Sequence, residues 1–380
     1  MATLTPEDPN AALPGIDAHP HARAVLAGAL PPQGAPSHAY LFHGPAGTGK
    51  RAIARAFEAA LLADGAADPA GVAERVARGS HPDLTWVTPS GAAEMLVADI
   101  EEPVVAAAAR TPFESSRRVF VIESVDTMND QAANRMLKTL EEPPAFVHLL
   151  LLSDRREDVL ATIASRCQQV RFDPLPPALM AERLELSEPE RARACAALAL
   201  GDARLAARLS SEEGEALRGA GEDLARSALA GTTDQRPWVG LLGMAKAAAT
   251  AAGEEAQERM SSELELLPAK EGKRYEREGL EARRRGERRV RTQTLDLALR
   301  LAELWLRDVL CICEGAPELV HAVDRRAQLE HDAGAQNGDG ARVRRGIELI
   351  GETRLSLPLN VSEELALEAL AYRLESLLAA

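Results

Sequence analysis

The feature that most constrains this chain is the stretch YLFHGPAGTGKRAIA, residues 40–54, where a glycine-rich turn joins an apolar run to an amphipathic helix. The turn, from Gly44 to Lys50, matches the pattern G-x-x-x-x-G-K. In such a turn, successive backbone N–H groups point inward around a phosphate, and the N-terminus of the following helix adds its positive end. The pattern therefore predicts a phosphate-binding loop. The alternative is a glycine-rich turn without chemical meaning.

The candidate nucleotide-binding residues are Gly44, Gly47, Thr48, Gly49, Lys50 and Arg51. The ammonium group of Lys50 is placed to neutralise the outer phosphates. The next position ordinarily carries Ser or Thr, whose hydroxyl holds a magnesium ion, but here it is Arg51.

The second half of such a site is a buried strand that ends in carboxylates, which hold magnesium and activate water. Residues 119–122 are continuously apolar and predict that strand. Glu123 and Ser124 follow, where a pair of acidic residues would be expected. Two parts of the hydrolytic apparatus are thus altered together. We expect the loop to be able to hold ATP or ADP, with no cofactor required and with little or no intrinsic hydrolysis.

The next segments continue an alternation of helices and strands, which predicts a doubly wound parallel sheet of the α/β class. A helix over residues 130–142 stops at Pro143-Pro144, and a buried strand ends at Ser153, a sensor-like position. Residues 165–167 then read Ser-Arg-Cys. By itself this tripeptide is weak evidence, and the residues alone are consistent with an Arg166 that pairs with a local carboxylate at the surface.

The segments NRMLKTLEEPP and ATIASRC resemble the clamp loader of bacterial DNA polymerase III, within the AAA+ ATPases. The delta-prime members of that family lack a competent ATPase site and keep the arginine of the Ser-Arg-Cys motif. The resemblance implies that Arg166, with Ser165 and Cys167, serves the ATP of a neighbouring subunit. It also implies a ring with gamma/tau and delta subunits as partners, which acts on a sliding clamp at primed DNA, and a polymerase activity that lies in another chain.

One departure from the family concerns zinc. Many members carry four cysteines between the phosphate-loop helix and the His-Pro-Asp stretch, but residues 61–80 contain none. Zinc needs four well-spaced ligands, so we expect no metal site. His81 alone is more consistent with a structural hydrogen bond.

Composition limits the partners and the compartment. The net charge of −14 is unlike that of a protein that grips DNA by itself. The four cysteines are too few and too scattered for a disulfide framework, and nothing at the start of the chain resembles a signal peptide. No run approaches the roughly 20 apolar residues of a membrane span. We therefore expect a cytoplasmic protein without membrane partners.

The resemblance implies three domains: a sheet domain over residues 1–173, a small helical lid over 174–211, and a helical collar over 212–380 that oligomerises. Arg204, in the lid, is either a second sensor of the γ-phosphate or a surface helix residue. The stretch 269–291 is the most basic of the chain. Its interleaved glutamates favour a salt-bridged, solvated helix over a strip that tracks DNA.

Two other classes of function remain to be tested. A self-sufficient ATPase, either the motor subunit itself or another AAA+ remodeller, would need Ser or Thr in place of Arg51 and an acidic pair near Glu123. A small-molecule kinase would leave the Ser-Arg-Cys motif and about 200 helical residues unexplained. Turnover by the chain alone, compared with turnover after motor subunits are added, separates these classes.

Overall fold

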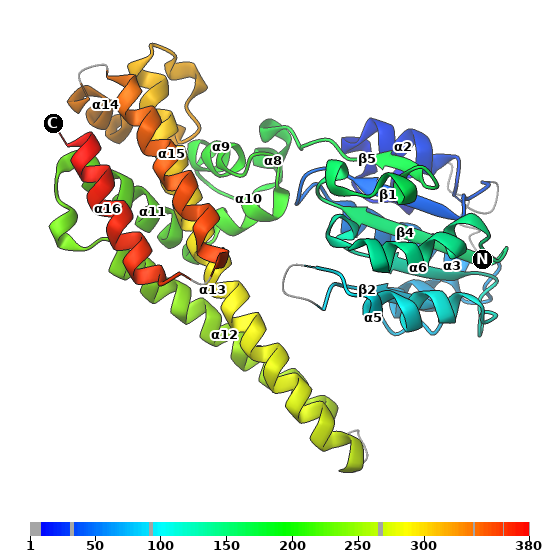
Figure 1. Ribbon diagram of the computed structural model, residues 1–380. Helices are drawn as coiled ribbons and strands as arrows, with labels where there is room; N and C mark the ends of the chain where they lie inside the picture. Colours follow the sequence, from blue (N-terminus) through cyan, green and yellow to red (C-terminus); the bar gives the residue numbers. More distant parts are fainter. Residues whose placement is uncertain are drawn as a thin grey trace. The chain divides into compact units, whose positions relative to one another are not determined.

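The computed structural model describes residues 9–30, 34–90, 94–264, 269–336, 339–359 and 361–379. The chain forms two compact units, residues 1–176 with 201–203, and residues 177–200 with 204–380. The first is an α/β unit and the second is entirely helical (Figure 1). This confirms the predicted fold class. The division into three domains stays a prediction, because the lid segment is grouped here with the helices that follow it.

The first unit is built on a parallel sheet with the strand order β2-β3-β4-β1-β5. Its strands are β1 Ala39–His43, β2 Leu84–Val87, β3 Arg118–Ile122, β4 Val147–Ser153 and β5 Gln168–Arg171. The central strand β4 is buried along its whole length, as expected of a parallel sheet covered on both faces. The predicted strand over residues 119–122 and the predicted strand that ends at Ser153 are both confirmed.

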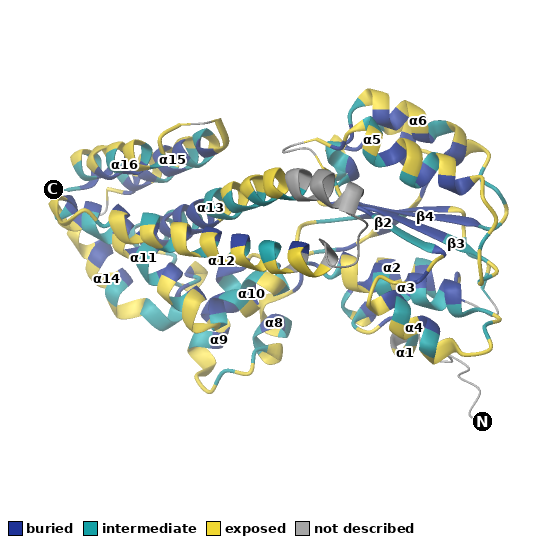
Figure 2. Cartoon of the chain, turned by 90° about the horizontal axis from the view of Figure 1, so that it is seen from below, coloured by how far each residue is buried: buried dark blue, intermediate teal, exposed yellow. Residues whose placement is uncertain are grey.

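Helices cover both faces of this sheet. One face carries α1 Pro9–Ala12, α2 Pro20–Ala27, α3 Lys50–Ala63 and α4 Pro69–Ala77, and the other carries α5 Val97–Ile100, α6 Asp130–Glu141 and α7 Ala161–Ala164 (Figure 2). A π-helical turn over Glu101–Ala106 extends α5. Alternate residues of each strand enter opposite cores: Phe42 packs toward α3, and Leu41 packs toward α6.

The capping residues explain where the helices of this unit begin. The Asn129 side chain accepts a hydrogen bond from the backbone N–H of Ala132 at the start of α6, and Pro143-Pro144 follows its end. Helix α3 starts at Lys50, directly after Gly49, whose φ is 90°. The phosphate-loop pattern and the helix boundary therefore coincide.

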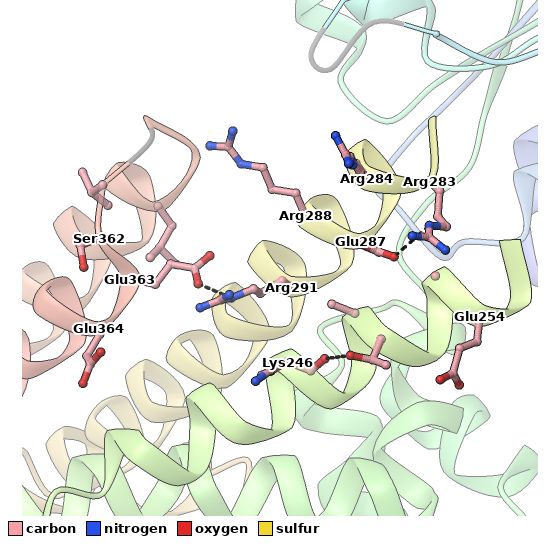
Figure 3. Close-up of a pocket in the computed structure, with 15 residues that line it drawn as sticks. Lys246, Glu254, Arg283, Arg284, Glu287, Arg288, Arg291, Ser362, Glu363 and Glu364 are labelled. Carbon is pink, nitrogen blue, oxygen red and sulfur yellow. Dashed lines mark hydrogen bonds and ion pairs between the residues drawn. The ribbon is translucent and has the colours of Figure 1, made fainter. Parts of the chain in front are cut away.

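The second unit contains the remaining long helices. They are α8 Pro177–Arg183, α9 Pro189–Leu198, α10 Ala203–Ser210, α11 Glu212–Ala230, α12 Trp238–Leu264, α13 Ala269–Cys313, α14 Arg326–Ala335, α15 Gly340–Ser356 and α16 Glu363–Leu378. Helices α12 and α13 pair as a long hairpin that extends beyond the other helices of this unit. An open groove of about 970 Å³ lies between this hairpin and the start of α16 (Figure 3).

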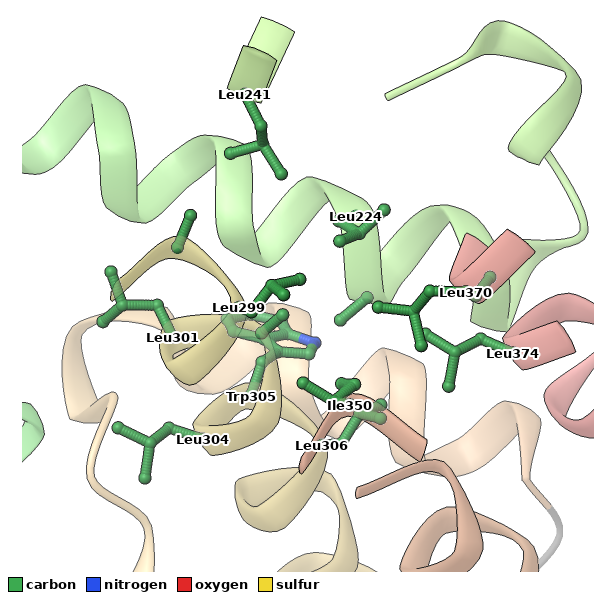
Figure 4. Packing of buried hydrophobic residues seen from close by; sticks show 14 of the residues in the cluster. Leu224, Leu241, Leu299, Leu301, Leu304, Trp305, Leu306, Ile350, Leu370 and Leu374 are labelled. Carbon is green, nitrogen blue, oxygen red and sulfur yellow. The ribbon is translucent and has the colours of Figure 1, made fainter. Parts of the chain in front are cut away.

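The core of the second unit is assembled mainly from leucine and alanine, with two tryptophans (Figure 4). The indole N–H of Trp305 donates to Asp332 Oδ2 over 3.0 Å, so this large ring is buried with its polar atom satisfied. Arg218 is fully buried, and its guanidinium donates to Glu222 over 2.6 Å and to both carboxylate oxygens of Asp324 over 2.8 Å. The paired carboxylates are what make a buried arginine tolerable here.

Among the described helices, none is long and apolar enough to cross a membrane. Likewise, the described His, Cys, Asp and Glu side chains include no group of three that could hold a metal ion. The cysteines Cys167, Cys195, Cys311 and Cys313 are free thiols.

Candidate functional site

The glycine-rich turn lies at the carboxyl end of β1 and leads directly into α3. Gly44 has a φ of 145° and Gly47 a φ of 71°, both in the region that favours glycine. A Cβ at Gly44 would overlap the carbonyl oxygen of Phe172, and one at Gly47 would overlap the carboxylate of Asp202. The Thr48 hydroxyl donates to the carbonyl of Pro45 over 3.0 Å. The backbone of the turn is therefore closely enclosed, and its role as a phosphate cradle stays a prediction.

Lys50 directs its ammonium group into this turn. Its Nζ donates to the carbonyl oxygens of Gly44 and Pro45, each over 2.6 Å, and lies 2.8 Å from Asp154 Oδ1. Burial lowers the pKa of Lys50, while Asp154 acts in the opposite direction. The carboxylate of Asp154 thus holds the cation that would otherwise neutralise a phosphate.

Arg51 and Glu123, which the sequence shows as two separate departures, are joined in the structure. The guanidinium of Arg51 forms an ion pair with Glu123 Oε2, and the indole N–H of Trp86 donates to Glu123 Oε1 over 2.8 Å. The Arg51 side chain is 50% exposed and that of Glu123 is 7% exposed. A fixed cation therefore stands beside the carboxylate that would hold magnesium, and both oxygens of this carboxylate are engaged.

Ser124 leaves the end of β3 in the left-handed conformation, with φ of 54°. Its carbonyl accepts a hydrogen bond from the Thr127 hydroxyl over 2.7 Å, so the residue shapes a turn. A serine hydroxyl lacks the basicity with which a carboxylate would activate water. Asp126 is nearby, but its Oδ2 lies 3.3 Å from Arg155.

One further predicted residue, Ser153, lies at this end of the sheet. Ser153 ends β4 directly beside His43 of β1, and its hydroxyl accepts the backbone N–H of Arg155 over 3.1 Å. The backbone N–H of Ala203 donates to the carbonyl of Gly47 over 3.2 Å. Arg204 follows in the first turn of α10, within the second unit, so its role as a second sensor stays a prediction.

The Ser-Arg-Cys motif lies at the opposite end of the strands from the glycine-rich turn. It directly precedes β5, which runs parallel to β1 with Gln168 opposite Tyr40 and Arg171 opposite His43. The motif is therefore next to the amino ends of the strands, whereas the glycine-rich turn follows their carboxyl ends. From Tyr40 to His43 the strand alone covers roughly 10 Å.

Arg166 is on the surface, with a side chain that is 35% exposed. Its guanidinium forms an ion pair with Glu141, at the end of α6, and donates to the carbonyl of Thr162 over 2.9 Å. The local carboxylate considered in the sequence interpretation is thus Glu141. Cys167 is buried, and burial raises the pKa of its thiol to about 12, so this thiol packs rather than reacts.

His81 makes the structural contacts expected of it. Its Nδ1 accepts the backbone N–H of Asp83 over 3.2 Å, and its Nε2 lies 2.9 Å from Glu114. The Asp83 carboxylate in turn accepts backbone N–H groups from Phe113, Glu114 and Ser115. The His-Pro-Asp stretch therefore anchors the loop that precedes β3.

Sequence reasoning missed four residues of the site: Trp86, Asp126, Asp154 and Asp202. The three carboxylates attract the Lys50 ammonium, and the indole holds Glu123. Asp154 could have been suspected, because it directly follows the sensor-like Ser153 at a strand end. Asp202 lies beside the glycine-rich turn although it is about 150 residues away in the sequence, and no local pattern predicts this contact.

Comparison with known proteins relates the first unit to replication proteins. Residues 20–176 match the family described as DNA polymerase III, delta subunit. The chain is 39% identical over 145 residues to the delta' subunit of Pseudomonas aeruginosa, covering 37% of this chain and 44% of that protein. It is 36% identical over 160 residues to the delta' subunit of Bacillus subtilis, covering 39% and 46%.

A lower similarity links the chain to tau subunits. The tau subunit of Bacillus subtilis is 34% identical over 145 residues, which is 36% of this chain and 24% of that protein. The chain spans less than half the length of the delta' relatives named above. The similarity thus characterises the first unit.

Proposed function

We propose that this chain works in the DNA polymerase III clamp loader as a stator, because its first unit is similar to delta' subunits. It would present Arg166 to the ATP of a neighbouring subunit while the sliding clamp is loaded on primed DNA. The gamma/tau and delta subunits would be its partners in the ring, and the cytoplasm its compartment. It would carry no polymerase activity and little or no ATPase activity of its own.

The observation that carries this proposal is the position of Arg166 relative to the sheet. The arginine directly precedes β5, at the amino ends of the strands, and the glycine-rich turn directly follows β1, at their carboxyl ends. An arginine side chain is too short to span from one edge to the other around its own domain. If Arg166 acts on a nucleotide, that nucleotide belongs to another chain.

The ion pair with Glu141 is compatible with such a role. Both side chains are partly exposed, and exposed ion pairs contribute only about 0–1 kcal/mol. A neighbouring triphosphate carries more charge than one carboxylate and can therefore draw Arg166 away from Glu141. Once there, the guanidinium would stabilise the negative charge that develops on the transferred phosphoryl group.

The chain's own nucleotide site has two parts, one for phosphate and one for magnesium, and they differ in how well they suit a nucleotide. The backbone cradle and Lys50 suit a phosphate, and ATP or ADP is a reasonable occupant. The cation half does not suit magnesium, because Arg51 replaces the hydroxyl ligand and pairs with Glu123. We therefore assign the chain a phosphate cradle without the water-activating carboxylate, and no zinc.

The test is the ATPase activity of a reconstituted loader with clamp and primed DNA. Replacing Arg166 by Ala should lower turnover at least about tenfold, while gel filtration shows an intact ring. The matched control is Arg171→Ala, since Arg171 is also exposed, pairs with Asp173 over 3.1 Å, and lies at the other end of β5. It should leave turnover unchanged.

Two outcomes would overturn the proposal. In the first, Arg166→Ala and Arg171→Ala have equal effects on turnover. In the second, the chain alone hydrolyses ATP at the rate of the loader, and the active ATPase motor becomes the better interpretation.

A further inference from the structure

Residues 279–291 of α13 concentrate positive charge in an acidic chain. They include six arginines and two glutamates, a formal charge of +4, whereas the whole chain has a net charge of −14. The helix that the sequence predicted for this stretch is confirmed. The side chains of residues 269–278, the first part of the predicted basic stretch, lie outside the described residues.

The predicted salt bridges account for only part of this charge. Arg283 lies 3.4 Å from Glu287 and donates to Gln257 Oε1 over 3.1 Å, and Arg291 pairs with Glu363 at the start of α16. Arg284, Arg285 and Arg289 are exposed and have no carboxylate within ion-pair distance among the described side chains. Three guanidinium groups of one helix segment are therefore exposed without a counter-charge from the side chains that the structure describes.

The spacing of the arginines increases their mutual repulsion. Arg284 and Arg288 are four residues apart, as are Arg285 and Arg289, so both pairs are neighbours on the helix surface. Like charges at this spacing destabilise a helix. An anionic ligand that bridges the two pairs would remove this repulsion. We call Arg284, Arg285, Arg288 and Arg289 the arginine arc.

The groove beside α13 gives such a ligand a place to lie. It is bounded by α12, α13 and the first turn of α16, and Lys246 adds a further cation from α12. Figure 3 shows Arg284 and Arg288 extending from the same side of α13, with Arg288 reaching into the space before α16. Four glutamates also line the groove: Glu254 on α12, Glu287 on α13, and Glu363 and Glu364 on α16. The arc contributes Arg284 and Arg288 to its lining, whereas Arg285 and Arg289 lie on the exposed surface of α13 outside it.

We propose that the arginine arc binds the phosphate backbone of nucleic acid. A planar guanidinium makes paired hydrogen bonds to phosphate oxygens, and arginine is the only basic residue type in residues 279–291. None of the described residues that line the groove is aromatic, so bases have nothing to stack on. Binding is therefore sequence-independent. An acidic protein partner fits less well, because its interface would need an apolar centre.

This inference does not depend on Arg166. It concerns binding by this chain alone, so it can fail while the stator proposal holds, and the reverse. On sequence alone, the interleaved glutamates favoured a salt-bridged, solvated helix over a strip that tracks DNA. This inference revises that preference, because the glutamates neutralise fewer arginines than their spacing suggested.

The experiment is fluorescence anisotropy of the full chain with labelled single-stranded and duplex DNA of about 20 nucleotides. Salt is varied from about 50 to 200 mM, where nonspecific binding has a Kd of roughly 10⁻⁴ to 10⁻⁶ M. The variant R284Q/R285Q/R289Q removes three charges and keeps good helix formers. We expect it to weaken binding at least about tenfold and to reduce the slope of log K against log salt by about three for duplex.

The matched control is R326Q/R344Q/R345Q, which makes the same change in net charge on exposed arginines that are already paired with glutamates. It should bind DNA as the wild type does. Circular dichroism should show the arc variant to be as helical as the wild type, since like-charge repulsion is relieved. The proposal is overturned if the control loses as much affinity as the arc variant, if the wild type does not bind DNA at low salt, or if poly-glutamate competes as well as DNA.

Discussion

Arg51 and Glu123 form an ion pair that links the first turn of α3 to the end of β3. In a hydrolytic site these two positions would share a magnesium ion. Here a guanidinium that belongs to the chain provides the positive charge. The two substitutions are therefore complementary, and neither can be interpreted without the other.

Arg51→Thr should create magnesium-dependent nucleotide binding, because it frees Glu123 and supplies a hydroxyl ligand. A labelled ADP titrated with magnesium, and then with a chelator, should show tighter binding with the metal in this variant only. The free energy of unfolding should fall by about 1 kcal/mol, since Glu123 is buried and Arg51 is half-exposed. Arg51→Met is the control: it should show the same loss of stability without the metal effect. A strong magnesium dependence in the wild type would contradict this view.

Asp154→Asn should tighten the binding of ADP several-fold, because the Asp154 carboxylate competes with a phosphate for the Lys50 ammonium. Equilibrium titration of the full chain measures the change. Asp158→Asn provides the comparison, since Asp158 lies in the same turn and pairs with Arg155 instead. Weaker binding by Asp154→Asn would mean that Asp154 orients Lys50 rather than competing with the ligand.

Glu58 makes the stability of the first unit depend on pH. Its side chain is fully buried on α3, with Arg55 Nη1 3.3 Å away, and burial raises the pKa of its carboxyl from 4.5 to about 8, against the effect of Arg55. Between these values the folded state holds a proton that the unfolded state has released. The free energy of unfolding therefore falls as pH rises through this window, and levels off above about pH 8.

Glu58→Gln should remove most of this dependence. Urea unfolding followed by circular dichroism at about pH 5.5 and about pH 8.5 should show the variant and the wild type diverging by up to about 4 kcal/mol, with the variant more stable at the higher pH. Glu74→Gln, at an exposed position paired with Arg78, should keep the wild-type dependence. Parallel pH profiles for Glu58→Gln and the wild type would show that Glu58 ionises normally in the folded chain.

The sheet and its turn could be predicted because their signals are local. The strand before Gly44, the helix from Lys50 and the helix capped by Asn129 follow from apolar spacing, glycine positions and capping residues. The family resemblance added the interpretation of Arg166, and its position before β5 agrees with a surface role.

The contacts that engage Lys50 and Glu123 could not be predicted, because they join segments that are distant in the sequence. Asp154 meets Lys50, and Trp86 meets Glu123, across more than 30 residues in each case. Periodicity identifies a helix but does not say which helix it packs against. For the same reason, the glutamates interleaved in residues 279–291 suggested more salt bridges than form: Arg283 pairs with Glu287, whereas Arg284, Arg285 and Arg289 pair with no described carboxylate.

The parallel direction of the strands has a consequence for assembly. A domain that offers an arginine at one edge and a nucleotide cradle at the other has a front and a back, so like domains join head to tail rather than face to face. Such a row ends at a member that presents its arginine to a neighbour but holds no nucleotide on which another subunit's arginine could act. If Arg166 acts on a neighbour as proposed, its exposure together with the hold of Asp154 on Lys50 would suit this chain to the end of such a row.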